Sequence, residues 1–476
     1  MGSRRRHIFF FLFLSLLLVP VLLFGEERVE ESKPSVVVIA SAEVGIGPIE
    51  EDLFLHLTPR LSILAPTRAL LCEVEDCSTF FEAALQVPVR LRLVDNEPFQ
   101  ESRLREEDWI EVSDFFRLIR RLSYGSRSTP LHLRVGELGP AQLGNASIVN
   151  GYYNVVTTDH YRLGFQGGLQ KELFSLELLS NHLLRPNLWA FRGELRHPIF
   201  FDPQSNWKRF SMGASAVTDL EAPIRLEAND EGRTLAGPDL FPDIAETSPT
   251  FIVGIDLRWH LLRNQRTTLT PYVDVNHHLE LGTGAHAGFY WSRSIESIAE
   301  ISTKLEYRLL TGRYLPDYID PLYEITRYQY PAQTPGLAAP KLEIARTMSP
   351  ATRHGGYGEI QARLLRLLVL SLAYSDAEGP SNADLRARAS LELNETARIG
   401  LFYYKFATSS EEESLFEKIA DLFRPEGALL ALEARQALWG PIYTHGQYGQ
   451  QWRLSDEGQF TSLHLWNVGI GAAFSF

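Results

Sequence analysis

The most constraining feature of this sequence is an alternation of apolar and polar side chains in segments of about ten residues, each followed by a turn. In residues 251–261, one face carries Phe251, Val253 and Ile255, while the other face carries Asp256. The same alternation recurs in residues 85–93, 299–309 and 385–394. A period of two is that of a β-strand, so the sequence predicts an all-β fold.

The number and length of these segments favour a membrane barrel over a soluble sandwich. We count about eighteen, within a range of about sixteen to twenty, and each is close to the nine to eleven residues of a tilted strand that crosses a bilayer. A soluble sandwich would bury the apolar face as its core, but no second apolar layer is evident to cover the sheet. We therefore predict a transmembrane antiparallel up-and-down β-barrel over residues 51–476, closed so that no backbone edge meets hydrocarbon.

The lengths of the gaps between segments support the same prediction. If the chain alternates direction, the long gaps should fall on one side: 64–83, 221–249, 313–356 and 409–427. The tight connections should fall on the other side: Lys171–Glu172, Arg263–Arg266, Ser294–Glu296, Leu365–Leu367, Asn394–Ala397 and Trp439–Pro441. Long outer loops with short periplasmic turns are typical of outer-membrane barrels.

The first 25 residues have the pattern of a secretory signal peptide. Arg4, Arg5 and Arg6 precede an apolar stretch that ends at Phe24, and Gly25 is followed by acidic residues. An uncleaved membrane anchor is the alternative. We expect residues 26–50 to form a periplasmic N-terminal segment ahead of the barrel.

Composition limits the partners and the chemistry. The formal net charge is -13 at pH 7 and the basic residues are scattered, which argues against nucleic acid as a partner. We find no serine-hydrolase, phosphate-loop or zinc-protease motif, and we expect no catalytic residues, no cofactor and no metal. Because some outer-membrane lipid hydrolases and acyltransferases are also barrels, an enzyme is the alternative.

The only two cysteines, Cys72 and Cys77, are separated by four residues. In an oxidising compartment this spacing suits a small loop closed by a disulfide, which we expect here. A metal-binding or redox pair is the alternative.

The C-terminal segment carries the most specific motif. Val468, Ile470, Ala472, Phe474 and the terminal Phe476 share one face of the last alternating segment. This segment resembles the closing strand of the porin-like outer-membrane β-barrel proteins of Gram-negative bacteria. The resemblance implies an outer-membrane location among lipid and lipopolysaccharide, and recognition of these five positions by the barrel assembly machinery.

The alternation weakens between residues 97 and 159. Residues 109–122 fit either a helix inside the lumen or periplasm, or a strand that returns through a turn into residues 131–135. The stretch rich in Gly and Asn that follows, 136–156, suits a loop folded into the pore as a constriction. An edge strand with an ordinary loop is the alternative.

The polar face of the segments predicts the lining of an aqueous lumen. The expected lumen residues are Arg90, Arg92, Asp256, Arg258, His260, Asp274, His278, His286, Glu300, Lys304, Glu306, Arg308, Arg386, Arg388 and Glu392. Because their charges are mixed, a ladder of cross-strand ion pairs and a charge-selective lining are both compatible with them. The hairpin around 281–283 would place His278 opposite His286, a weak candidate pair for a metal.

Three functions fit a barrel of this kind. The leading hypothesis is a passive porin-like channel for small polar solutes. A surface receptor, adhesin or structural barrel working through its long loops is the second hypothesis, and a transporter that passes hydrophobic molecules through a lateral opening is the third. The sequence does not predict the solute or the oligomeric state.

Overall fold

The computed structural model describes the chain from residue 36 to its end, apart from short gaps. The gaps are 50–51, 72–77, 97–101, 111, 157–160, 197–208, 229–241, 297, 332–337, 379–382, 395, 407–414, 424–427 and 455–459. The expected signal peptide and the pair Cys72 and Cys77 lie outside the described residues.

One antiparallel sheet forms the wall of a barrel and confirms the predicted fold class. Its strands are β1 (Val37–Ile49), β2 (Asp52–Arg68), β3 (Ser78–Gln86), β4 (Val89–Val94), β5 (Ile119–Tyr124), β6 (Leu131–Gly136), β9 (Gly164–Gln170), β10 (Phe174–Ser180), β11 (Leu188–Arg196), β12 (Phe210–Leu226), β13 (Ile244–Trp259), β14 (Leu262–Arg263), β15 (Thr267–His278), β16 (Gly282–Ile295), β17 (Ala299–Gly312), β20 (Arg353–Leu364), β21 (Leu368–Ala377), β22 (Asp384–Asn394), β23 (Ala397–Phe406), β24 (Ala428–Trp439), β25 (Ile442–Leu454) and β26 (Phe460–Ser475). Since β4 continues β3 and β14 continues β13 along the same neighbour, the wall described has 20 strands, at the upper end of the predicted range.

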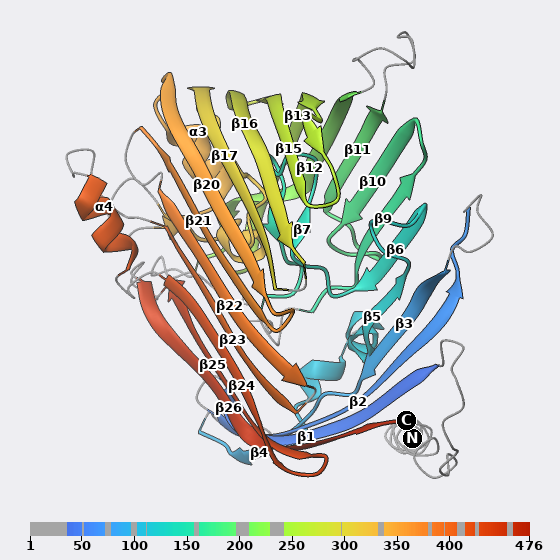
Figure 1. Ribbon diagram of the computed structural model, residues 1–476. Helices are drawn as coiled ribbons and strands as arrows, with labels where there is room; N and C mark the ends of the chain where they lie inside the picture. Colours follow the sequence, from blue (N-terminus) through green and yellow to red (C-terminus); the bar gives the residue numbers. More distant parts are fainter. Residues whose placement is uncertain are drawn as a thin grey trace.

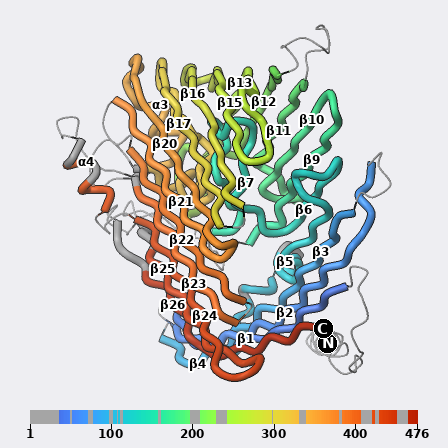
Figure 2. The backbone as a smooth tube through the Cα atoms, in the orientation of Figure 1, coloured from blue at the N-terminus to red at the C-terminus, as the bar shows by residue number. Residues whose placement is uncertain are grey.

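The barrel closes where its first strand meets its last. The strands follow one another around the wall in chain order, and β1 lies beside β26 (Figures 1 and 2). Their pairing runs from Ile39 opposite Ser475 to Ile46 opposite Val468. Residues 37–49 are therefore part of the barrel, and the expected boundary at residue 51 is corrected: without β1 the edge of β26 would be unpaired.

Side chains alternate between the two faces of the wall as the period of two requires. On β13, Val253, Ile255 and Leu257 point outward and are exposed, while Ile252 and Asp256 are buried inside. On the last strand, Val468, Ile470 and Phe474 are likewise exposed on one face, and the terminal Phe476 follows at the same parity. An apolar exterior around an ionic interior is the reverse of a soluble protein and suits a hydrocarbon surrounding. No helix among the described residues is long and apolar enough to cross a membrane.

Most of the long connections lie at one end of the barrel. The six tight connections predicted from the sequence and the C-terminal residue lie at the other end, which we call the turn end, and the connections around 227–243, 313–352 and 407–427 lie at the opposite loop end. Not every connection follows this sorting, since residues 279–281 join β15 to β16 at the loop end, and residues 197–209 join β11 to β12 at the turn end. The gap expected at 64–83 differs from the prediction. Because β2 continues to Arg68 and β3 begins at Ser78, this connection has nine residues instead of twenty and falls at the turn end.

The segment that the sequence left ambiguous combines both alternatives. Two 3-10 helices, η1 (Glu106–Trp109) and η2 (Val112–Leu118), lead directly into strand β5, which forms a hairpin with β6. The two helices have only four and seven residues, so neither of them forms the separate lumen helix that was one of the two alternatives.

Candidate functional site

Two long connections at the loop end fold back into the barrel and fill much of its interior. The first inner segment, residues 137–163, joins β6 to β9 and contains β7 (Ala141–Gln142) and β8 (Asn150–Tyr152). The second inner segment, residues 313–352, joins β17 to β20. It contains α2 (Tyr323–Thr326), β18 (Tyr330–Pro331), β19 (Ala338–Ala339) and α3 (Lys341–Thr347). The sequence predicted an outer loop at 313–356, so its burial is a correction.

The two inner segments are bonded to each other through their backbones. Val149 and Ile319 form a parallel bridge, in which Asn150 N donates to the Ile319 carbonyl at 3.0 Å and Ile319 N donates to the Ile148 carbonyl at 3.0 Å. Asp317 N also donates to the Ser147 carbonyl at 3.0 Å. These bonds satisfy backbone groups that would otherwise be buried without partners.

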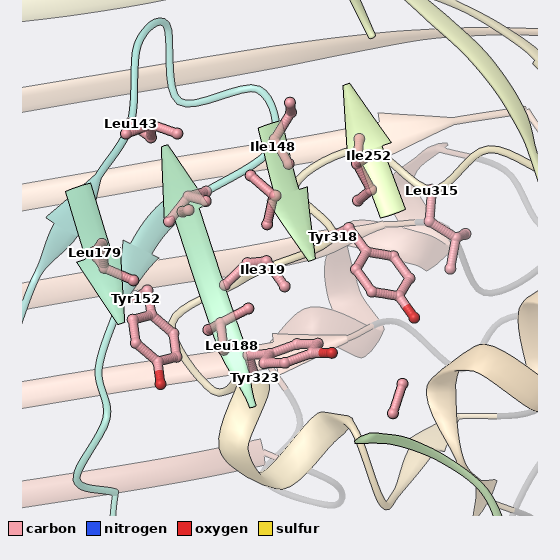
Figure 3. Close-up of a cluster of buried hydrophobic side chains, with 14 of the residues drawn as sticks. Leu143, Ile148, Tyr152, Leu179, Leu188, Ile252, Leu315, Tyr318, Ile319 and Tyr323 are labelled. Atoms are coloured by element: carbon pink, nitrogen blue, oxygen red, sulfur yellow. The ribbon is translucent and has the colours of Figure 1, made fainter. Parts of the chain in front are cut away.

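An apolar cluster packs the inner segments against one side of the wall. Tyr152 of the first segment and Tyr318 and Tyr323 of the second lie among Leu188 of β11 and Ile252 of β13 (Figure 3). All five side chains are at most 1% exposed. The interior on this side is therefore a packed core rather than water.

Polar contacts fix the tip of the first inner segment, residues 143–149, to the wall. Asp274 of β15 accepts a hydrogen bond from the Ser147 hydroxyl at 2.6 Å, and Arg258 of β13 donates to the Asn145 side chain at 2.7 Å. The Lys304 ammonium donates to the Asn145 carbonyl at 2.8 Å. Three wall strands thus hold one buried turn of the chain.

A buried cluster of charges surrounds Glu306 on β17. Its carboxylate accepts from Arg308 at 2.6 Å, from His286 at 3.0 Å and from Tyr272 at 2.5 Å, and it lies 3.1 Å from Lys304. Arg308 also pairs with Asp317 of the second inner segment at 3.1 Å. Because each charge has an opposite partner, the cluster can be buried, and losing one member would leave another unpaired.

A second polar cluster joins the two inner segments near α2. Tyr152 donates to the Glu324 carboxylate, and Arg162 lies 3.4 Å from the same group. Burial and the neighbouring Glu324 raise the pKa of Tyr152 well above its usual value, so its hydroxyl remains a donor. Arg327 pairs with Asp219 of β12 at 3.2 Å and ties this cluster to the wall.

The space that the inner segments leave open lies along the opposite wall, beside β1, β2 and β22–β26. This cavity measures about 650 Å³, a size common for small-molecule sites. The charged side chains of its lining are Glu43, Arg60, Arg90, Arg117, Glu137, Arg388, Glu392, Arg398 and Glu433. Several are paired, such as Arg60 with Glu43 at 2.6 Å and Arg398 with Glu433 at 2.5 Å.

The residues expected to line the lumen fall into two groups. One group is buried under the inner segments or in ion pairs: Arg90, Asp256, Asp274, His278, His286, Lys304, Glu306, Arg308 and Arg386. The other group is at least partly exposed: Arg92, Arg258, His260, Glu300, Arg388 and Glu392. Of these fifteen, Arg90, Arg388 and Glu392 line the cavity.

The two candidate metal-binding histidines do not face one another. In the register of β15 and β16, His278 lies opposite Gly282 and His286 lies opposite Asp274. His278 contacts the Thr250 hydroxyl at 2.7 Å, whereas His286 contacts Glu306. The prediction placed the hairpin turn two residues too late, and the described residues hold no cluster of three metal-ligating side chains.

Sequence reasoning missed the charged residues that the inner segments supply. Asp317, Asp320, Glu324, Arg327 and Lys341 are all at most 4% exposed. One signal was available: residues 314–330 alternate tyrosines with charged residues and apolar ones, which is unusual for a loop in water. Such a composition indicates a segment that packs against protein.

Comparison with solved structures finds similar chains among outer-membrane proteins. The chain is similar to the outer membrane protein OpdK of Pseudomonas aeruginosa (9% identity, 93% of this chain and 98% of that one, TM-score 0.35). It is similar to OprD of the same organism (10% identity, 93% of each chain, TM-score 0.33) and to OccAB3 of Acinetobacter baumannii (8%, 93% and 99%, TM-score 0.34). No protein-family model matches the sequence, and no curated protein matches it.

Proposed function

We propose that this protein is a passive channel for small polar solutes in the outer membrane of a Gram-negative bacterium. The observation that carries the proposal is the off-centre cavity: a space of about 650 Å³ with a charged lining, inside a wall whose outer face is apolar. With the turn end in the periplasm and the loop end at the cell surface, this cavity is the passage, and the inner segments narrow it.

The lining favours weak selection by charge. Five arginines and four glutamates face the cavity among the described residues, and at least two pairs of them neutralise each other. Solutes are therefore selected mainly by size and by hydrogen bonding, with a small preference for anions.

Single-channel recording in planar bilayers tests this proposal. We expect steady open steps whose size is limited by the narrowed lumen, and a reversal potential in a salt gradient that is displaced only slightly toward anions. Silent bilayers containing folded protein would refute the channel. A strong preference for cations would refute the account of the lining.

The long loops carry less support for a receptor or adhesin than the sequence suggested. Within the long gap expected at 313–356, residues 314–328 are almost all buried inside the barrel, and so are Leu342 and Ala345 of α3, whereas positions such as 347 and 349–352 are exposed. Most of the described part of this connection therefore does not present a surface to a partner. We therefore keep the channel as the one proposed function.

A further inference from the structure

Four neighbouring strands of the wall are too short to cross a membrane. β5 and β6 have six residues each, and β9 and β10 have seven. A strand that crosses the hydrocarbon core needs about nine to eleven residues. Over the residues that the structure describes, the wall is therefore incomplete at these four strands, unlike at β12, which has 17 residues.

The missing part lies toward the loop end. At the turn end the short strands are aligned with their neighbours, because Gly125 N donates to the Phe80 carbonyl at 3.0 Å and Arg196 N donates to the Leu173 carbonyl at 2.7 Å. At the other end β6 stops at Gly136, where the first inner segment leaves the wall.

The strands on either side continue past the short ones. β3 pairs with β5 only as far as Leu85 opposite Ile119, yet the same strand direction continues through β4 to Val94. β11 begins at Leu188 opposite Asp219, whereas β12 continues to Leu226. Residues 103–105 cover the edge of β4, because Arg92 N donates to the Arg103 carbonyl at 2.7 Å and Arg105 N donates to the Arg90 carbonyl at 3.1 Å. Among the described residues the wall thus has a lateral gap, bounded by the segment that leads from residue 103 into β5 on one side and by β12 on the other.

The chain segments that border this gap expose large apolar side chains. Ile110 and Phe115, next to and within the 3-10 helices before β5, are 69% and 53% exposed. Leu183 and Leu184, in the connection after β10, are 46% and 49% exposed. Apolar side chains at this level suit contact with acyl chains.

The cavity reaches the inner side of the same gap. Its lining includes Glu137, the residue after β6, and Tyr161, which lies shortly before β9. The Tyr161 hydroxyl donates to the carbonyl of Ile119, the first residue of β5, so this side chain lies across the end of β6. The polar cavity and the exposed apolar side chains that border the gap, which we call the rim, are therefore adjacent here.

We propose that the lumen opens sideways through the lateral gap at the level of the outer leaflet, and that it admits amphipathic solutes with a single hydrocarbon chain. The polar end of such a solute occupies the cavity, while its chain extends between the apolar side chains of the rim. This inference rests on the proposed channel in the outer membrane, and it adds a second solute class, which enters sideways, to the small polar solutes of that channel.

The test measures where spin labels meet lipid and where they meet water. A background with Cys72→Ser and Cys77→Ser in proteoliposomes receives a nitroxide at Tyr161→Cys, or at Leu184→Cys on the rim. The matched control is Gln447→Cys. Gln447 lies on β25 and lines the cavity, and β25 is paired there with both of its neighbours, β24 and β26. Collision rates are measured with oxygen, which concentrates in hydrocarbon, and with a water-soluble nickel chelate.

We expect the ratio of oxygen to nickel collisions to be severalfold higher at positions 161 and 184 than at 447. Decanoate should slow the motion of the label at 161 and leave 447 unchanged, whereas butyrate, which has the same head group, should change neither. A ratio at 161 equal to that at 447 would show a sealed wall and overturn the lateral opening, whatever the ratio at 184, because a label on the rim meets lipid in either case. Equal effects of decanoate and butyrate would overturn the solute class.

Conductance of the same preparations separates the two proposals. Open steps together with a sealed wall would reject the lateral opening and leave the channel standing. Silence in every variant, the background included, would reject the channel itself whatever the spin labels report.

Discussion

Replacing Lys304 by Met should loosen the tip of the first inner segment. The ammonium donates to the Asn145 carbonyl at 2.8 Å, lies 3.1 Å from Glu306 and lies 4.6 Å from the centre of the Tyr357 ring. Methionine fills most of the same volume but offers none of these interactions.

The free energy lost in Lys304→Met can be estimated from the partners that Glu306 keeps. Breaking a buried ion pair typically costs about 3–5 kcal/mol. Because Glu306 keeps Arg308 and His286, we expect the lower end, about 3 kcal/mol. If this loss destabilises only the state in which the tip is bound to the wall, the population of molecules with a detached tip rises about 150-fold. A free-energy change of about 1.4 kcal/mol corresponds to a factor of ten.

Single-channel recording measures the effect as current noise and as brief openings to a larger conductance, both far more frequent in Lys304→Met. The control is Arg363→Met, because Arg363 and Glu300 form an exposed pair at 3.6 Å that contributes at most about 1 kcal/mol. Current traces of Lys304→Met that match those of Arg363→Met would refute the role of Lys304 in holding the tip.

Three further predictions concern the wall. Ile255→Arg, on the outer face, should lower the free energy of unfolding by about 2–4 kcal/mol in a bilayer, whereas Ser390→Arg, facing the cavity, should change it little; equal effects in urea unfolding would contradict the assignment of faces. Gly469→Ala should destabilise the barrel in heat-modifiable gel mobility, because its Cβ would lie 2.0 Å from the Val44 carbonyl oxygen, and Gly446→Ala, with nothing within 4 Å, should not. Deleting Phe476 should lower the folded yield in cells, since its backbone pairs with Val38 at 2.9 and 3.1 Å and closes the barrel; a normal yield of folded protein would refute this.

The alternation of side chains was enough to predict the barrel. Each strand has hydrocarbon on one face and an ionic interior on the other, and this arrangement directly imposes a period of two on the sequence. Residues such as Val253 and Ile255 are outside, and Asp256 is inside, as their parity requires. Parity does not fix register, however. The His278 and His286 prediction was wrong because a hairpin turn displaced by two residues moves each partner by four while keeping every face.

The interior was harder to predict because it depends on contacts between distant parts of the chain. Asn145 and Lys304 are in contact only because the first inner segment folds into the barrel beside β17. Neither residue has a sequence pattern that predicts this contact. The second inner segment was taken for an outer loop since a connection has no periodicity to show where it packs. Short strands such as β6 also lack enough residues for alternation to reveal their ends.

A nitroxide scan along β23 tests the central claim most directly, because this strand has hydrocarbon proposed on one face and cavity water on the other. Labels replacing Ile399 and Leu401, which are 51% and 38% exposed, should collide mainly with oxygen. Labels replacing Arg398 and Gly400, on the face that carries the ion pair of Arg398 with Glu433, should collide mainly with the nickel chelate, giving two profiles of period two in opposite phase. Profiles in the same phase, or no position with preferential access to oxygen, would contradict a lipid-facing wall around a hydrated lumen.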